Sequence, residues 1–132
     1  MKTFVDTSAL YALLDEQDAR HQDAARWLRG PGRDPRELLV SHNYVVVEAV
    51  ALTGRQLGAA AVRALLNGFV PALSVFYVDE HLHATAVSAY LAAGGKPSLV
   101  DWASFQMMRD MGIRRAFAFD QDFVAQGFEA VP

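Results

Sequence analysis

Cysteine is absent from this 132-residue sequence. The chain therefore has no disulfide framework, no thiolate metal site and no cysteine nucleophile, and any metal ion must be held by oxygen or imidazole ligands. The sequence also lacks a signal-peptide pattern at its start and any apolar run long enough to span a bilayer. Together these absences are typical of a reducing compartment, and we expect a cytoplasmic protein with no membrane attachment.

An excess of positive charge is lacking too. The formal net charge is −3, whereas domains that bind nucleic acid by bulk electrostatics are usually strongly basic. Local basic clusters remain in two stretches of the chain, the first made of Arg20, Arg26, Arg29, Arg33 and Arg36, the second of Arg109, Arg114 and Arg115. We interpret each cluster as a solvated helix face.

The length and the apolar content fit one globular domain over residues 1–132. Short apolar runs predict strands at residues 2–5, 38–40, 75–78, 115–119 and 128–131. Amphipathic patterns predict helices at residues 7–15, 21–29, 43–53, 59–72, 81–93 and 98–112, with Ser41 or Asn43 as the cap of the third and a turn or short helix at 120–126. The β-branched run 45–47 leaves a longer strand open as an alternative. This alternation predicts an α/β fold whose mostly parallel sheet of about four or five strands is covered on both faces.

Two acids stand where predicted strands end. Asp6 follows the apolar pair Phe4-Val5 and precedes a helical pattern, and Asp120 follows the strand predicted at 115–119. Ligands of open α/β sheets bind outside the carboxyl ends of the strands, so both side chains are candidates for a functional crevice. Alternatively, Asp6 is only a helix N-cap. We expect Asp122, two residues beyond Asp120, to cap the short helix or to act through a water molecule.

Two further acids stand inside or at the start of predicted helices. Glu48 lies within the apolar run 45–52, which contains no basic residue. Because Glu is seldom buried unless it is paired or bound to metal, Glu48 belongs either to a metal site or to a narrow exposed stripe of the helix. Asp101 follows Ser98 at the spacing of a capping box, and a first-turn carboxylate also projects toward whatever lies in front of the helix.

If these four acids converge, their repulsion must be relieved by protons or cations. Two unit charges ~4 Å apart repel by ~4 kcal/mol at an effective dielectric constant near ~20. Oxygen ligands favour Mg²⁺ or Mn²⁺, and the chemistry that follows is phosphodiester hydrolysis by a metal-activated water. Thr7 or Ser8 either orients that water or caps the first helix. We expect the four histidines to be structural or solvent-facing.

Several of these segments, taken in order, are similar to a known family. They are residues 4–10 (Phe-Val-Asp-Thr-Ser-Ala-Leu), Glu48, the helix start 98–101, and 119–123 followed by Gly127-Phe128. Over essentially the whole chain they resemble PIN-domain proteins, and more narrowly the ribonuclease toxins of VapBC-type toxin–antitoxin pairs. The resemblance implies an α/β/α sandwich, Mg²⁺- or Mn²⁺-dependent endoribonuclease activity on RNA, a homodimer and a small antitoxin partner. It assigns the family's acidic positions, and with them metal binding and catalysis, to Asp6, Glu48, Asp101 and Asp120.

Two other functions remain open from the residues alone. A phosphatase or phosphotransferase with an aspartyl nucleophile also places Asp after the first strand, but commonly carries a second Asp two residues on, where this chain has Ser8. A non-catalytic RNA- or partner-binding module would use the acids only as helix caps. For a partner, we expect an antitoxin groove on apolar side chains of the first two helices that look exposed, namely Leu10, Leu13, Trp27 and Leu28.

Overall fold

The computed structural model describes residues 1–132 as five strands and seven α-helices. The strands are β1 (Lys2–Val5), β2 (Leu38–His42), β3 (Ser74–Phe76), β4 (Arg115–Phe117) and β5 (Glu129–Val131). The helices are α1 (Thr7–Leu14), α2 (His21–Arg29), α3 (Asn43–Gln56), α4 (Ala59–Ala64), α5 (Glu80–Ala92), α6 (Leu99–Met111) and α7 (Asp122–Ala125). None of the helices has the length and apolar character that crossing a membrane requires.

All neighbouring strands are parallel, in the order β3-β2-β1-β4-β5. In the central strand, Phe4 is paired with Val40 of β2 and with Ala116 of β4. The carboxyl ends of β1 and β4 are therefore adjacent, and the backbone N–H of Asp6 donates to the carbonyl of Phe117 at 3.1 Å. This strand order brings the two loops that carry Asp6 and Asp120 to the same edge of the sheet.

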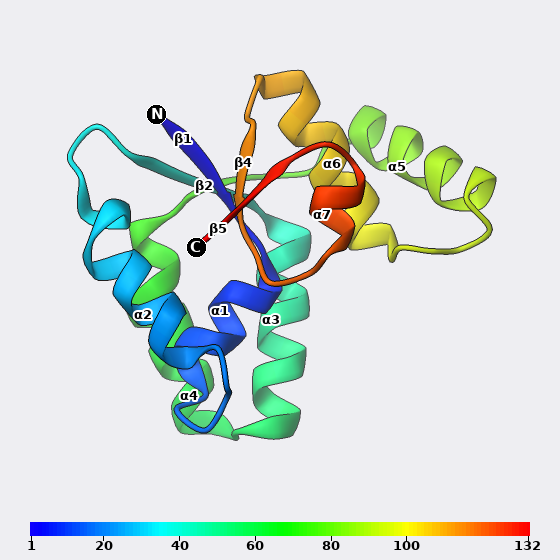
Figure 1. The fold of residues 1–132 in the computed structure, drawn as a ribbon. Coiled ribbons are helices and arrows are strands. Elements are labelled where there is room, and N and C mark those ends of the chain that lie inside the picture. Colours follow the sequence, from blue (N-terminus) through cyan, green and yellow to red (C-terminus); the bar gives the residue numbers. More distant parts are fainter.

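Helices cover both faces of the sheet (Figure 1). Helices α1 to α4 connect β1, β2 and β3 on one side, and α5 to α7 follow β3 on the other side. Right-handed crossovers require this arrangement, because the chain first moves outward from β1 to β3 and then returns across β1 to β4 and β5. The three-layer α/β/α sandwich and the mostly parallel sheet predicted from the sequence are both confirmed.

Successive side chains of the central strand β1 point to opposite faces of the sheet, and each packs against the helices on its own side. The ring of Phe4 lies 6.2 Å from that of Phe123, on the side of α6 and α7. Val5 points the other way and shares a small apolar hollow with Leu28 and Phe117. On this second side the rings of Trp27 and Phe117 lie 4.5 Å apart. The sheet is thus buried on both faces, as parallel sheets normally are.

Two element boundaries differ from the sequence prediction around the second strand. Strand β2 extends to His42, and the cap of α3 is His42 itself, whose Nδ1 accepts a hydrogen bond from the N–H of Val45 at 3.3 Å. The predicted caps Ser41 and Asn43 are therefore wrong. Residues 45–47 are helical, so the alternative of a longer strand is also wrong.

The other differences concern helix continuity and the end of β4. The helix predicted for 59–72 ends as α4 at Ala64 and continues as a π-helical turn, Leu65–Phe69, and a 3₁₀ turn, Val70–Ala72. Strand β4 ends at Phe117 rather than at 119. The N–H of Phe119 donates to the Ser8 hydroxyl at 3.0 Å and not to a neighbouring strand, so the ladder has ended by this residue.

The apolar side chains that looked exposed on the first two helices are mostly buried. Leu10, Leu13 and Trp27 are only 1%, 8% and 7% exposed, and they belong to the main hydrophobic core. The expected antitoxin groove on these three side chains is therefore wrong. Their amphipathic pattern faces the sheet of the chain itself, which leaves a partner no access to them.

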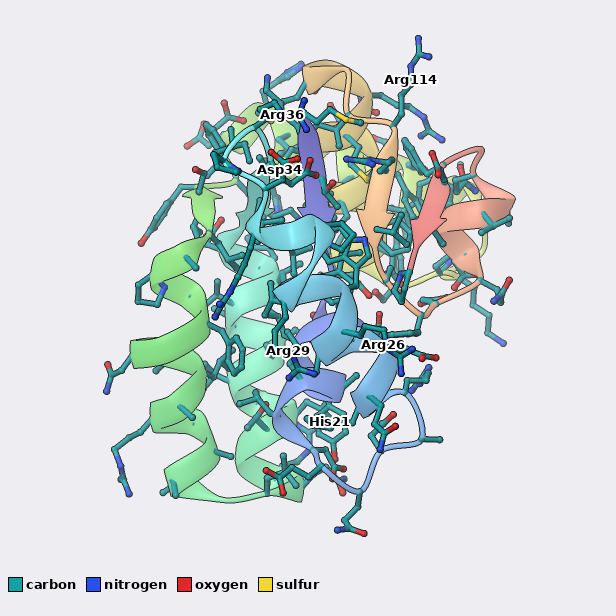
Figure 2. All side chains as sticks on the ribbon, turned by 60° about the vertical axis from the view of Figure 1, so that its left-hand side comes forward. His21, Arg26, Arg29, Asp34, Arg36 and Arg114 are labelled. Carbon is teal, nitrogen blue, oxygen red and sulfur yellow. The ribbon has the colours of Figure 1, made fainter.

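The first arginine cluster is a solvated face, as interpreted from the sequence. Its five members are exposed, and Figure 2 shows Arg26 and Arg29 on α2 with Arg36 in the loop that follows. Arg26 pairs with Asp23 at 3.3 Å and Arg36 with Asp34 at 2.7 Å. Exposed pairs of this kind contribute little to stability.

Candidate metal centre

Four acids from four elements meet at the carboxyl edge of the sheet. Asp6 follows β1, Glu48 lies in the second turn of α3, Asp101 in the first turn of α6, and Asp120 in the loop between β4 and α7. The charges of Asp6, Asp120 and Glu48 each raise the pKa of Asp101, and that of Glu48 raises the pKa of Asp6. Asp6, Glu48 and Asp120 therefore all lie near enough to Asp101 for their charges to act on it.

Asp6 is the most deeply buried of the four. Its side chain accepts hydrogen bonds from the N–H and the hydroxyl of Ser8, at 3.2 and 2.7 Å. Burial is the main cause that raises its pKa from 3.8 to about 6, and it outweighs the opposing effect of the Ser8 hydrogen bonds. The helix-cap role and the crevice role therefore coexist, because Asp6 caps α1 and is also a buried carboxylate whose charge a nearby cation would stabilise.

Asp101 combines a structural and an electrostatic role in the same way. It forms the predicted capping box with Ser98, whose hydroxyl accepts from the N–H of Asp101 and donates to the Asp101 carboxylate at 2.9 Å. Burial and then the charge of Asp6 raise the pKa of Asp101 from 3.8 to about 7. Ser98 thus holds one carboxylate oxygen of Asp101 in place, while the neighbouring acids disfavour the negative charge of Asp101.

Asp120 and Asp122 share the same space as Asp101. Carboxylate oxygens of the three residues all lie within 4.8 Å of one another. Asp120 accepts a hydrogen bond from the N–H of Asp122 at 2.9 Å, and Asp122 is the first residue of α7 rather than its cap, which is Gln121. Asp120 is also not the first residue beyond β4, since Ala118 and Phe119 intervene. The predicted strand end is therefore wrong, and so is the cap role of Asp122, whereas the alternative that Asp122 acts through a water molecule stays a prediction. Asp122 lies in the same carboxylate group, and burial and Asp120 both raise its pKa.

Ser8 connects the two loops of the site. Its hydroxyl donates to Asp6 at 2.7 Å and accepts from the N–H of Phe119, the residue before Asp120, at 3.0 Å. The sequence left the roles of Thr7 and Ser8 open, and the structure gives Ser8 this bridging role. The Thr7 hydroxyl is buried and has no hydrogen-bond partner within the chain, which is uncommon for a buried polar group and leaves it available to a ligand.

The donor set fits a hard divalent cation. All five carboxylates offer oxygen ligands, and none of them forms a salt bridge with Lys, Arg or His. Oxygen-rich, uncompensated negative sites suit Mg²⁺, Mn²⁺ or Ca²⁺ rather than metals that prefer sulfur or imidazole. A divalent cation would therefore neutralise charge that the protein itself leaves unpaired.

Residues 3–129 match the family model described as the PIN domain. The chain belongs to the PIN-domain family.

Curated relatives and solved structures place this PIN domain more closely. It is 37% identical over 131 residues to the "23S rRNA-specific endonuclease VapC20" of Mycobacterium tuberculosis, covering 97% of this chain and 96% of that protein. The crystal structure of VapC20, described as a sarcin–ricin loop cleaving toxin, matches with a TM-score of 0.86 and 34% identity over 98% and 99% of the two chains. FitAcB from Neisseria gonorrhoeae matches with a TM-score of 0.70 at 15% identity over 100% and 97%, which shows a common fold only. The PIN domain is thus a homologue of VapC-type ribonuclease toxins.

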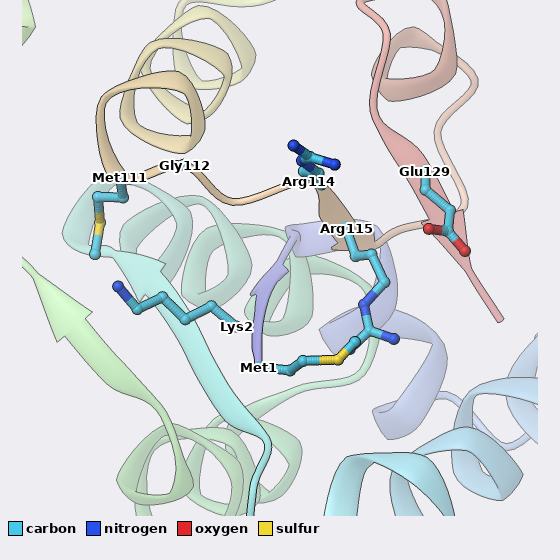
Figure 3. A pocket seen from close by; sticks show the side chains of 7 residues that line it. All are labelled: Met1, Lys2, Met111, Gly112, Arg114, Arg115 and Glu129. Carbon is cyan, nitrogen blue, oxygen red and sulfur yellow. The ribbon is translucent and has the colours of Figure 1, made fainter.

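A hollow at the opposite edge of the PIN domain has a different character (Figure 3). It has a volume of about 450 Å³ at the amino ends of β1 and β4, and its lining includes Lys2, Arg114, Arg115 and Glu129. Arg115 is held there by Glu37 at 2.9 Å. Because basic groups outnumber carboxylates, this hollow does not suit a cation, and the metal chemistry belongs to the acids at the carboxyl edge.

Proposed function

We propose that residues 1–132 form a single PIN nuclease domain that cleaves RNA with the help of Mg²⁺ or Mn²⁺. In this proposal Asp6, Glu48, Asp101 and Asp120 bind the metal and are the catalytic residues. The observation that carries it is the convergence of carboxylates without a basic partner at the carboxyl edge of the sheet. Family membership and homology with VapC20 favour a nuclease over the aspartyl phosphatase and the non-catalytic module that sequence alone left open.

The side chains prepare the site before any ligand binds. A bound divalent cation supplies Lewis-acid chemistry, activating water and neutralising charge that develops on a phosphodiester. Ser8 and Ser98 each hold a carboxylate oxygen, of Asp6 and Asp101 respectively, so these ligands need little reorientation. The raised pKa values of Asp6 and Asp101 mean that both carboxyl groups exchange a proton for a cation near neutral pH.

Ribosomal RNA is the substrate class that we propose. The relative VapC20 is named as specific for 23S rRNA, and it is similar to this chain over nearly its whole length. Single-stranded loops are the parts of RNA that proteins read by sequence, because their bases are accessible. Because the solved structure of VapC20 is described as that of a sarcin–ricin loop cleaving toxin, an rRNA hairpin that presents such a loop is our first substrate.

We further propose that the chain is the toxin of a toxin–antitoxin pair and forms a homodimer. The carboxylate cluster lacks a cation of its own, so a partner that inserts Arg or Lys would block it by taking the place of the metal. Exposed aromatic side chains at the β3 edge, Phe76 and Tyr77 at 46% and 82% exposure, are available to a second copy. Light scattering of the purified chain should give twice the monomer mass.

The decisive test is cleavage of a defined rRNA hairpin by protein that has been treated with EDTA. We expect no cleavage until Mg²⁺ or Mn²⁺ is added, and almost none by Asp101→Asn at any metal concentration. Asp110→Asn is the matched control, because Asp110 is an exposed acid on the same helix whose carboxylate accepts a hydrogen bond from Gln106 and from none of the site residues. Cleavage that persists in EDTA, or equal losses in the two variants, would contradict the proposal.

A further inference from the structure

The imidazole of His42 is buried completely where β2 passes into α3. Its Nε2 lies 2.8 Å from the hydroxyl oxygen of Ser104 on α6, and its Nδ1 accepts from the N–H of Val45 on α3. The Ser104 hydroxyl donates its hydrogen to the carbonyl of Val100 at 3.0 Å. The Ser104 oxygen is therefore the acceptor, Nε2 carries the proton, and His42 is a neutral ring in one tautomer. Consistently, burial lowers the pKa of His42 to about 4.

This ring joins two helices that lie on opposite faces of the sheet. Helix α3 belongs to the layer of α1 to α4 and α6 to the layer of α5 to α7. No other side-chain hydrogen bond connects α3 or its cap to α6. His42 is thus the polar link between α3 and α6, while the hydrogen bond between Tyr44 and His83 joins α3 to α5.

The two ends of the link lie one turn away from two of the acids. On α3, Val45 precedes Glu48 by three residues, and on α6, Ser104 follows Asp101 by three residues, so each pair is neighbouring on its helix. Glu48 and Asp101 both carry a carboxylate at this edge of the sheet, and like charges repel. The hydrogen bonds of His42 hold each helix one turn away from its acid, and they therefore oppose the separation of the two helices by this repulsion.

We propose that His42 is a positioning residue that sets the spacing of Glu48 and Asp101 through its hydrogen bonds to α3 and α6. The inference rests on the proposed function, in which these two acids bind a divalent cation. His42 contacts neither acid directly, so it acts through the two helices. Groups that orient metal ligands in this indirect way typically change metal affinity by about 10- to 100-fold when removed.

Two substitutions distinguish the hydrogen bond between His42 and Ser104 from the capping hydrogen bond between His42 and Val45. Ser104→Ala removes the acceptor on α6 and leaves the cap of α3 intact. His42→Asn keeps a side chain that caps helices well but is too short to reach Ser104. Ser104→Thr retains the hydroxyl, which in a helix can still donate to the carbonyl four residues earlier, and serves as the rescue. Leu65→Val, at a fully buried position in the π-helical turn outside both helices, controls for general loss of core packing.

The readouts are the Mn²⁺ dissociation constant and the separate kcat and KM for RNA. For Ser104→Ala and His42→Asn we expect Mn²⁺ affinity and kcat to fall by about 10-fold or more, with KM within about 2-fold of wild type. Ser104→Thr should recover most of both, and Leu65→Val should leave both unchanged. If Ser104→Ala behaves like Leu65→Val in affinity and kcat, the positioning role is refuted.

Hydrogen exchange distinguishes failure of this inference from failure of the proposed function. If wild-type protein neither binds Mn²⁺ nor cuts RNA, the proposed function is wrong. The tie between the helices is still measurable, because Ser104→Ala should accelerate amide exchange in the first turn of α3 while Leu65→Val should not. Unchanged exchange in Ser104→Ala would overturn the tie itself.

Discussion

Replacing Asp6 by Asn should stabilise the metal-free protein at neutral pH although it destroys the site. The Asp6 side chain is 4% exposed, and burial raises its pKa from 3.8 to about 6. Asn has nearly the same shape, can accept the same hydrogen bonds from Ser8, and caps helices about as well as Asp. The substitution therefore removes a buried charge and leaves the surrounding structure in place.

The sign and the size of the effect follow from the two pKa values. Between pH 3.8 and about 6 the folded protein keeps the Asp6 proton, whereas the unfolded chain has released it. Raising the pH through this window therefore lowers the free energy of unfolding, and the loss is complete above about pH 6. The interval between the two values corresponds to roughly 3 kcal/mol. The Asn variant does not titrate here, so it should gain up to that amount over wild type.

Urea unfolding in EDTA at about pH 4.5 and about pH 7.5 measures this gain. We expect the advantage of Asp6→Asn to grow with pH, and Asp110→Asn, an exposed acid, to show no such trend. Addition of Mn²⁺ should reverse the order, because only wild type keeps the full ligand set and is stabilised by binding. An advantage that stays constant with pH, or a variant that is less stable than wild type at both pH values, would refute the reasoning.

Two further substitutions test other parts of the structure. Asp120→Asn and Asp122→Asn should both weaken Mn²⁺ binding in calorimetric titrations at matched folding, because both carboxylates lie within 4.8 Å of Asp101; we expect the larger loss for Asp120, and wild-type affinity in either variant would remove that residue from the site. Trp27→Ala should lower the free energy of unfolding by roughly 3–5 kcal/mol, since the ring packs in the core against Phe117. A loss under about 1 kcal/mol in urea unfolding would mean that Trp27 is a surface residue after all.

Hydrophobic periodicity was sufficient to predict the order of strands and helices. It did not decide between strand and helix where local propensity favoured the other structure. The run 45–47 is β-branched, yet α3 buries Val45, Ala49 and Thr53, which recur every four residues. That helical period was visible in the sequence and is more informative than the local β-propensity. The cap was missed because His42 acts through a buried ring nitrogen, whereas Ser and Asn are the usual helix caps.

The four acids could be selected from the sequence, but their grouping depends on the order of the strands. Asp6 and Asp120 are neighbours only because β1 and β4 are adjacent in the sheet, which no local pattern specifies. The choice of Asp120 over Asp122 as a ligand stays a prediction, but the strand end that supported it lies two residues earlier than predicted, and the ends of elements are the least reliable feature of a sequence prediction. Ser8 contacts the loop before Asp120, 111 residues later, so its bridging role had no local signal.

The side chains of the first two helices show a different limit of sequence-based prediction. An amphipathic helix presents the same pattern whether its apolar face packs on its own sheet or on a partner. The pattern of Trp27 and Leu13 predicts a surface for a partner, whereas both side chains belong to the core. Only the tertiary arrangement, in which α1 and α2 pack together over β1 and β4, distinguishes the two cases.

Calorimetric titration of Mn²⁺ into the metal-free protein, in buffers of different ionisation enthalpy, tests most directly whether the carboxylate cluster is a metal site. Asp6 and Asp101, with pKa values raised to about 6 and about 7, must lose their protons when the metal binds. We therefore expect proton release on binding at about pH 6, and an affinity that increases between about pH 5.5 and about pH 7.5. Binding without proton release and with the same affinity across this range, or no binding at all, would contradict the assignment.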